Sequence, residues 1–180
     1  INAAIEVLKL APAKDLQYES NYLLGELYLA ANDLMQAAKS FELALAINET
    51  YEAYFQLGLI FSHIQKYENA QIYFEKALKF NPDLVPALIN MGAILRNTGK
   101  FTESLQHLDK ALELDKADPA AWLNKGVTLD SMGNLQDAIA CYEKALSLDG
   151  GYLEAYSNKG NAELGLGRLK EAHDSFQMAL

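Results

Sequence analysis

The sequence predicts an all-α protein built as a solenoid of stacked two-helix repeats. Small and aromatic residues recur at a fixed spacing along its 180 residues. One column holds glycines at intervals of 33, 34, 34 and 34 residues: Gly25, Gly58, Gly92, Gly126 and Gly160. Three further columns keep the same register: Ala37, Ala70, Ser104, Ala138 and Ala172; Phe41, Phe74, Leu108, Tyr142 and Phe176; Ala44, Ala77, Ala111, Ala145 and Ala179. Self-similarity at one period indicates repeats that stack on their neighbours.

Each repeat contains two amphipathic helices joined by a short turn. In the fourth repeat the first helix is expected from Ala120 to Met132, where Trp122, Gly126 and Leu129 share one packing face. A residue suited to a left-handed conformation follows the first helix in four repeats: Asn32, Gly99, Gly133 and Gly167. Second helices are expected to begin near Leu34, Tyr67, Phe101, Leu135 and Leu169 and to end at Asn48, Asn81, Asp115 and Asp149.

The glycine column requires a physical reason, because glycine inside a helix is about 1 kcal/mol less favourable than alanine. We expect the second helix of the same repeat to approach so closely that a Cβ would obstruct it. The alanine columns support the same contact from its other side. Since two helices cannot bury their apolar faces alone, neighbouring repeats must stack.

These residues resemble the tetratricopeptide repeat, a two-helix unit of about 34 residues with the pattern Trp-x2-Leu-Gly-x2-Tyr followed by Ala, Phe, Ala and Pro. The matching residues are Trp122, Gly126, Ala138, Tyr142 and Ala145, and also Tyr54, Leu57, Gly58, Phe61, Ala70, Phe74, Ala77 and Pro82. The resemblance implies a right-handed superhelical solenoid of helix-turn-helix repeats. Its expected repeats are residues 18–50, 51–84, 85–118, 119–152 and 153–180, the last lacking its tail. Residues 1–17 are expected to be the second helix of an incomplete repeat.

Composition and charge argue against several classes of function. The formal net charge of −9 and the pI near 4.8 disfavour nucleic acids and anionic membranes, which attract clustered Lys and Arg. No apolar run approaches the length of a membrane span, about 18 residues, so direct membrane insertion is not expected. The single cysteine, Cys141, is compatible with a reducing compartment, and we expect a cytoplasmic location.

No pattern of catalytic or metal-binding residues accompanies the repeats. His63, His107 and His173 occupy three different places within their repeats, so stacking cannot align them as ligands. Neither a nucleophile elbow nor a phosphate-binding loop is present. We therefore expect a protein that is not an enzyme, with no catalytic residue, no metal site and no cofactor.

The resemblance also implies where a ligand binds, because in the family the first helices line a concave groove. The residues expected there, which we call the inner face, are Tyr22, Glu26, Phe55, Gln56, Leu59, Ile89, Asn90, Arg96, Leu123, Asn124, Val127, Asp130, Asn158 and Asn161. Asn90, Asn124 and Asn158 stand one repeat apart, and such amides can hydrogen-bond a peptide backbone at about 1 kcal/mol each. An alternative interpretation is that asparagine is simply common at this position in the family.

The charges of the inner face predict the chemistry of a partner. Repeat domains that hold the acidic tails of heat-shock chaperones use cations that no window of this chain supplies, whereas Glu26 and Asp130 are acidic. We therefore expect a scaffold or adaptor that binds a neutral or basic, extended or helical segment with apolar anchors. Two alternatives are a substrate-recruiting arm of a larger enzyme, for example a glycosyltransferase, and self-association through exposed solenoid ends.

Overall fold

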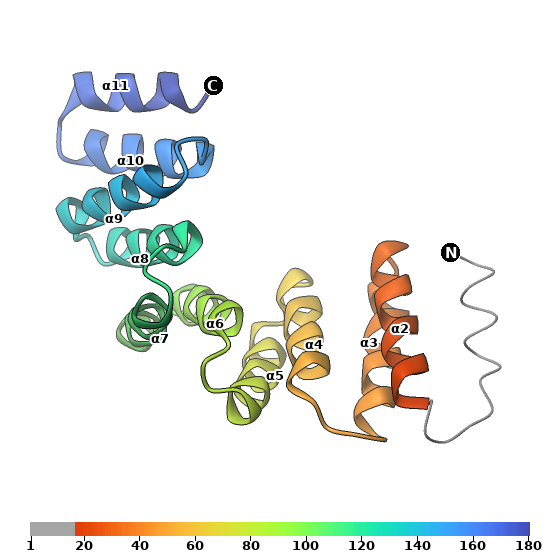
Figure 1. Cartoon of the computed structure of the whole chain (residues 1–180). Coiled ribbons are helices and arrows are strands. Elements are labelled where there is room, and N and C mark those ends of the chain that lie inside the picture. Colours follow the sequence, from red (N-terminus) through yellow and green to blue (C-terminus); the bar gives the residue numbers. More distant parts are fainter. Residues whose placement is uncertain (1–16) are drawn as a thin grey trace. The chain divides into compact units, whose positions relative to one another are not determined.

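The computed structural model describes residues 17–180, and all regular structure there is helical (Figure 1). The helices are α2 (Gln17–Ala30), α3 (Leu34–Leu45), α4 (Tyr51–His63), α5 (Tyr67–Phe80), α6 (Val85–Asn97), α7 (Phe101–Leu114), α8 (Pro119–Ser131), α9 (Leu135–Leu148), α10 (Leu153–Gly165) and α11 (Leu169–Met178). The predicted all-α architecture of consecutive helix pairs is confirmed. The helix expected over residues 1–17 lies outside the described residues, except for Gln17, which begins α2.

The chain forms two compact units, one ending at Ala87 and the other beginning at Leu88. In the first unit, α3 packs against both α2 and α4, and α4 packs against α5. In the second unit, α8 contacts α7 and α9, and α10 contacts α9 and α11. Within each unit, the second helix of one repeat therefore packs against the first helix of the next, as stacked repeats require.

The glycine column marks the closest contact within each repeat. A Cβ on Gly58 would lie 2.5 Å from the Phe74 ring, and one on Gly126 would lie 2.5 Å from the Tyr142 ring. In the other repeats, a Cβ on the glycine would lie 2.6 to 2.7 Å from the nearest atom of Phe41, Leu108 or Phe176. The expected close approach of the two helices is confirmed, and its partner is the aromatic or leucine column.

The turns after the first helices adopt the expected left-handed conformation. Gly99, Gly133 and Gly167 have φ values of 78°, 80° and 75°, and Asn32 has 58°. In the second repeat this place is taken by Gln65, also at 58°, which the sequence pattern did not identify. Glutamine reaches this region at a cost of about 1–2 kcal/mol, because its Cβ crowds the backbone.

Helix starts follow the sequence more closely than helix ends. The second helices begin at the five expected residues, and α8 begins one residue early, at Pro119, where Asp118 accepts a hydrogen bond from Ala121 N (2.9 Å). Among the ends of the second helices, the largest difference from the expectation is in α3. This helix ends at Leu45 and not at Asn48. There Ile47 N and Asn48 N both donate to the Ala44 carbonyl, so the last turn tightens and the helix stops.

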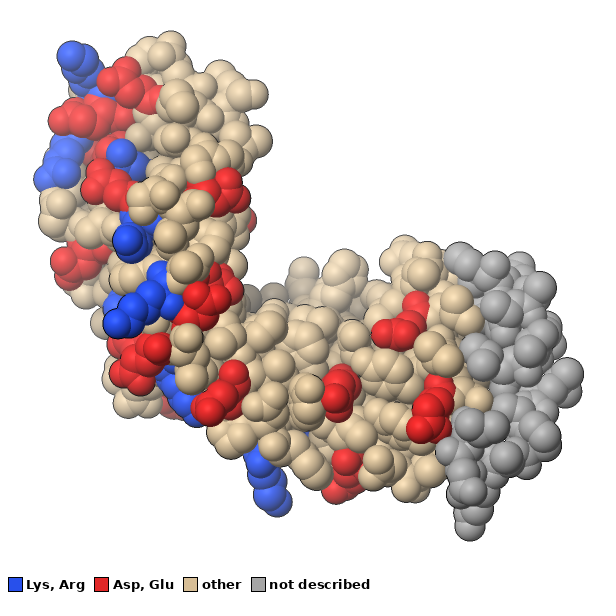
Figure 2. Space-filling view, in the orientation of Figure 1, with Lys and Arg blue, Asp and Glu red and all other residues tan. Residues whose placement is uncertain are grey.

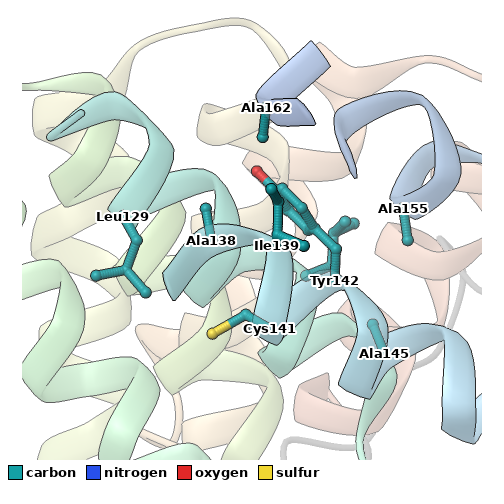
Figure 3. Close-up of a cluster of buried hydrophobic side chains, with 9 residues drawn as sticks. Leu129, Ala138, Ile139, Cys141, Tyr142, Ala145, Ala155 and Ala162 are labelled. Carbon is teal, nitrogen blue, oxygen red and sulfur yellow. The ribbon is translucent and has the colours of Figure 1, made fainter. Parts of the chain in front are cut away.

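Tyr142, which is fully buried, belongs to a hydrophobic core cluster of the second unit. Figure 3 shows this cluster, to which α8, α9 and α10 contribute side chains, among them Leu129, Ile139 and Ala162. Cys141, 6% exposed, belongs to the same cluster, and its burial raises the pKa of the thiol. The cysteine is therefore a small apolar core residue with a protonated thiol at neutral pH.

Candidate peptide-binding surfaces

In the first unit, the inner-face residues of α2 and α4 come together. Tyr22 is half-buried, and its ring meets Phe41 edge-on with 5.2 Å between centroids. Burial raises the pKa of Tyr22, a side-chain hydrogen bond with Gln56 of α4 offsets part of that increase, and the charge of the exposed Glu26 adds to it. Tyr22 and Gln56 thus link the first helices of two neighbouring repeats.

An apolar concavity of about 230 Å³ adjoins these residues. Its lining residues are Leu29, Leu34, Gln56, Leu59, Ile60 and His63. Gln56 and Leu59 were predicted to face a ligand, and the other four were missed. The spacing from Gln56 to Ile60 and His63 is that of one helical face, so the amphipathic pattern of α4 could have identified two of them. The remaining predicted residue of α4, Phe55, is half-buried with its ring centroid 5.8 Å from that of Phe74.

Of the three residues of α6 that were predicted on the inner face, the two polar ones are more exposed than the apolar one. Ile89 is buried, 9% exposed, whereas Asn90 and Arg96 are half-buried. The Arg96 guanidinium donates through Nε and Nη2 to Asn97 Oδ1, at 3.4 and 3.3 Å. The single predicted cation of the inner face is therefore engaged by a neighbouring side chain.

On α8 the structure separates packing residues from surface residues. Leu123 is 3% exposed within the core cluster, and Val127 packs against that cluster, so neither offers much surface to a ligand. Asn124 is half-buried, and its Nδ2 donates to the Ala120 carbonyl at 2.9 Å. Asp130 accepts a hydrogen bond from the Tyr142 hydroxyl at 3.4 Å. Burial, and then the charge of Asp130, raise the pKa of Tyr142.

The asparagines of α10 are the most available amides of the inner face. Asn158 is half-buried and Asn161 is exposed. Within residues 17–180, neither side chain makes a hydrogen bond, whereas the amide of Asn124 is used by its own helix. These two amides lie one turn apart and keep their donors and acceptors for an external partner.

A polar groove of about 370 Å³ lies between α9, α10 and α11, and we call it the α9 groove. Its lining residues are Gln136, Ile139, Glu143, Tyr156, Lys159, Glu163, Arg168, Glu171, Asp174, Ser175 and Met178. The carboxylate of Glu163, only 4% exposed, accepts a hydrogen bond from Ser175 Oγ at 2.7 Å. Lys159 Nζ lies 3.5 Å from Glu163 Oε1 and 3.3 Å from Glu143 Oε1. Every charge at the base of this groove has a partner within the protein.

The described residues lack two kinds of feature that would suggest other chemistry. No three His, Cys, Asp or Glu side chains between residues 17 and 180 cluster as a metal site would require. In the same part of the chain, each helix is too short or too polar to cross a membrane.

Comparison with known protein families gives one family along most of the chain. Models described as "Tetratricopeptide repeat" match residues 18–51, 51–84, 73–106 and 119–152, and a model described as "TPR repeat" matches residues 92–133. No curated protein matches the sequence significantly.

Solved structures with the same fold include several repeat proteins of similar length. MamA from Desulfovibrio magneticus, residues 41 to the end, has a TM-score of 0.82 at 20% identity, over 91% of this chain and 93% of that one. Pseudomonas aeruginosa PilF has a TM-score of 0.80 at 21% identity, over 92% and 76%. YrrB, described as "a TPR protein with an unusual peptide-binding site", has a TM-score of 0.71 at 23% identity, over 89% and 83%. At these identities the likeness establishes the fold alone.

Proposed function

Because this chain belongs to the tetratricopeptide repeat family, we propose that it is a protein-interaction module that binds a peptide segment on its inner face. The observation that carries the proposal is the pair of available amides on α10, Asn158 and Asn161. An extended peptide lacks intramolecular partners for its own backbone N–H and C=O groups. Side-chain amides can supply both a donor and an acceptor to such a backbone whatever its sequence.

Apolar surface beside polar groups supports the same proposal in the first unit. The concavity next to Gln56 and Leu59 is lined mainly by apolar side chains and can accept an apolar anchor of a partner. That YrrB, a protein of this fold, is described as having a peptide-binding site agrees with a peptide ligand here. Amides for the backbone and apolar concavities for the anchors are complementary requirements of peptide recognition.

The inner face favours a neutral or basic peptide. Glu26 in the first unit is exposed and Asp130 in the second unit is half-buried, so each carboxylate is accessible to a ligand. Arg96, in contrast, already donates to Asn97. A peptide with several carboxylates would add repulsion without gaining a free cation on this face.

Binding of synthetic peptides to immobilised protein tests the proposal. The probes are short peptides with leucine and phenylalanine anchors flanked by lysine or by glutamine. Asn158→Ala with Asn161→Ala should weaken their binding about 10- to 30-fold, since each lost hydrogen bond is worth about 1 kcal/mol. Asn134→Ala, an exposed asparagine outside the inner face, is the matched control and should bind as the wild type does.

The outcomes distinguish binding on the inner face from binding elsewhere on the protein. Equal binding by the double variant and the wild type, or no binding of any of these peptides, would refute the inner-face site. The comparison requires that the double variant keep the helical circular dichroism of the wild type. We expect this, because Asn158 is half-buried and Asn161 is exposed.

A further inference from the structure

A second apolar concavity in the first unit borders the one beside the inner face and shares Leu34 and Ile60 with it. The helix α3 and the C-terminal half of α4 enclose about 620 Å³, a volume typical of ligand pockets. Its apolar walls are Leu34, Met35, Ala38, Ile60, Phe61 and Ile64. Three polar residues, Lys39, Glu42 and Lys66, complete the lining. We call this concavity the α3 groove, and none of the predicted inner-face residues lines it.

Met35 is the most unusual residue of the α3 groove. It is the second residue of α3 and is 80% exposed. The equivalent residues of the other second helices are all polar: Glu68, Thr102, Gln136 and Lys170. Four repeats therefore form the same helix start without an apolar side chain here, so folding does not explain the methionine. Its flexible thioether suits a surface that adapts to an apolar partner group.

The two lysines of the α3 groove give the partner its charge. Within residues 17–180, neither Lys39 nor Lys66 lies within ion-pairing distance of a carboxylate. The carboxylate of Glu42 accepts a hydrogen bond from the Tyr73 hydroxyl at 3.4 Å. In the α9 groove, Arg168, which stands where the α3 groove has Lys66, is hydrogen-bonded to Gln136. The α3 groove thus offers two unpaired ammonium groups beside an apolar cavity.

We propose that the α3 groove is a second docking site, for a partner segment in which a bulky apolar side chain is flanked by acidic residues. The apolar anchor enters between Met35 and Phe61, and the flanking carboxylates reach Lys39 and Lys66. Burial of the anchor supplies affinity, and the two lysines select the sequence around it. This preference for acidic flanks is opposite to that of the inner face, so the two sites take different segments.

Fluorescence anisotropy with a labelled synthetic peptide tests the docking site. The peptide carries a central Leu-Phe pair with glutamates on both sides, and two control peptides replace either the glutamates by glutamine or the Leu-Phe pair by serine. Wild-type protein should bind the first peptide at least about tenfold more tightly than either control. The preference over the glutamine peptide should disappear in about 0.5 M salt, because exposed charges are then screened.

Variants locate the site on the protein. Met35→Gln, which introduces the residue type that the fourth repeat has at this position, should weaken binding about fivefold, and Lys66→Glu should weaken it about tenfold or more. Lys100→Glu is the matched control, since Lys100 is exposed and stands one repeat after Lys66, so the same change of net charge should leave binding unchanged. The double variant of Asn158 and Asn161 should also bind this peptide normally, which distinguishes failure here from failure of the inner-face proposal.

Three results would overturn the docking site. The first is that the wild type does not bind the acidic peptide more tightly than the two controls. The second is that Lys66→Glu and Lys100→Glu have the same effect, which would indicate long-range charge only. The third is concentration-dependent self-association, seen by sedimentation, that Met35→Gln abolishes, because the occupant would then be a second copy of this chain.

Discussion

The α3 groove and the α9 groove occupy equivalent places along the chain but have different chemistry, each formed by the second helix of one repeat and the first helix of the next. Five pairs of lining residues are equivalent by repeat spacing: Met35 and Gln136, Ala38 and Ile139, Glu42 and Glu143, Phe61 and Glu163, and Lys66 and Arg168. In the first groove the base is apolar, with Phe61 stacked on Tyr73 at 5.2 Å between ring centroids. In the second groove the base is ionic, with Glu163 held by Ser175 and Lys159.

The difference shows that the fold does not require one residue type at these positions. The second and fifth repeats both keep the contact between a first-helix glycine and a second-helix ring, and both form regular helices. The contacts are Gly58 with Phe74 and Gly160 with Phe176. In Figure 2, charged side chains of both signs gather over the second unit, whereas those on the visible face of the first unit are mostly Asp and Glu. Exposed positions among them, such as Met35 and Gln136, can instead be used for binding.

The largest expected effect comes from removing the charge of Lys159 in the α9 groove. Lys159→Met leaves the buried Glu163 carboxylate without its positive partner and should lower the free energy of unfolding by about 2 kcal/mol. Lys125→Met is the matched control one repeat earlier. Lys125 Nζ lies 2.6 Å from Asp109 Oδ1, but the Asp109 side chain is 52% exposed, so this variant should lose less than about 1 kcal/mol of unfolding free energy. Urea unfolding followed by circular dichroism measures both. Equal losses would mean that burial of Glu163 does not control the energy of this pair.

Converting the base of the α9 groove to an apolar pair should be neutral or favourable. Glu163→Leu with Ser175→Cys introduces the residue types of the preceding repeat, where Leu129 and Cys141 are both buried. Lys159 keeps Glu143 as its partner. Replacing a buried ionic contact by apolar packing of similar volume should change the free energy of unfolding by between zero and about +1 kcal/mol. A loss of stability in urea would show that the network is needed for packing.

Exchanging the exposed residues of the two grooves should have a smaller effect. Met35→Gln and Gln136→Met, made separately, should each change the free energy of unfolding by less than about 0.5 kcal/mol, because both side chains are exposed. Thermal unfolding measures this change, and peptide binding is measured on the same samples. A large destabilisation by Met35→Gln would give the methionine a folding role and remove the argument for docking.

The smallest effect is a pH dependence at the wall of the α3 groove. Burial raises the pKa of Tyr73 above its usual value, and the charge of Glu42 and the hydrogen bond to Glu42 raise it further. Tyr54 and Lys76 also face the ring of Tyr73. The neutral hydroxyl stabilises the fold below the usual tyrosine pKa, and this contribution is lost as pH rises through the raised value. Glu42→Gln should lower the Tyr73 pKa, as measured by NMR titration of labelled tyrosines. An unchanged pKa would assign the increase to burial alone.

The repeat architecture could be predicted from the sequence because it depends on contacts that recur in every copy. The glycine column predicted the close approach of the two helices, and the starts of the second helices followed from the same register. The nearest partner of each glycine is the aromatic or leucine column, whereas the alanine columns were expected there. The inner face was harder, because a position within a repeat does not determine what surrounds a particular side chain. Leu123 was expected at the surface of the groove and is 3% exposed. The burial of Glu163 could not be predicted from the sequence, since a carboxylate is typical of a solvated surface. Its partners, Ser175 and Lys159, are known only from the structure.

The left-handed conformation of Gln65 affects how the first unit opens. The turns of the third to fifth repeats use glycine at this place, where a positive φ costs little, whereas Gln65 has a φ of 58°. Local opening releases that strain, so the amide protons of the turn between α4 and α5 should exchange with solvent sooner than those of the glycine turns. Lys66, the next residue, belongs to the α3 groove. An occupant that holds Lys66 should therefore disfavour opening of this turn, and slower exchange there would report occupancy of the groove.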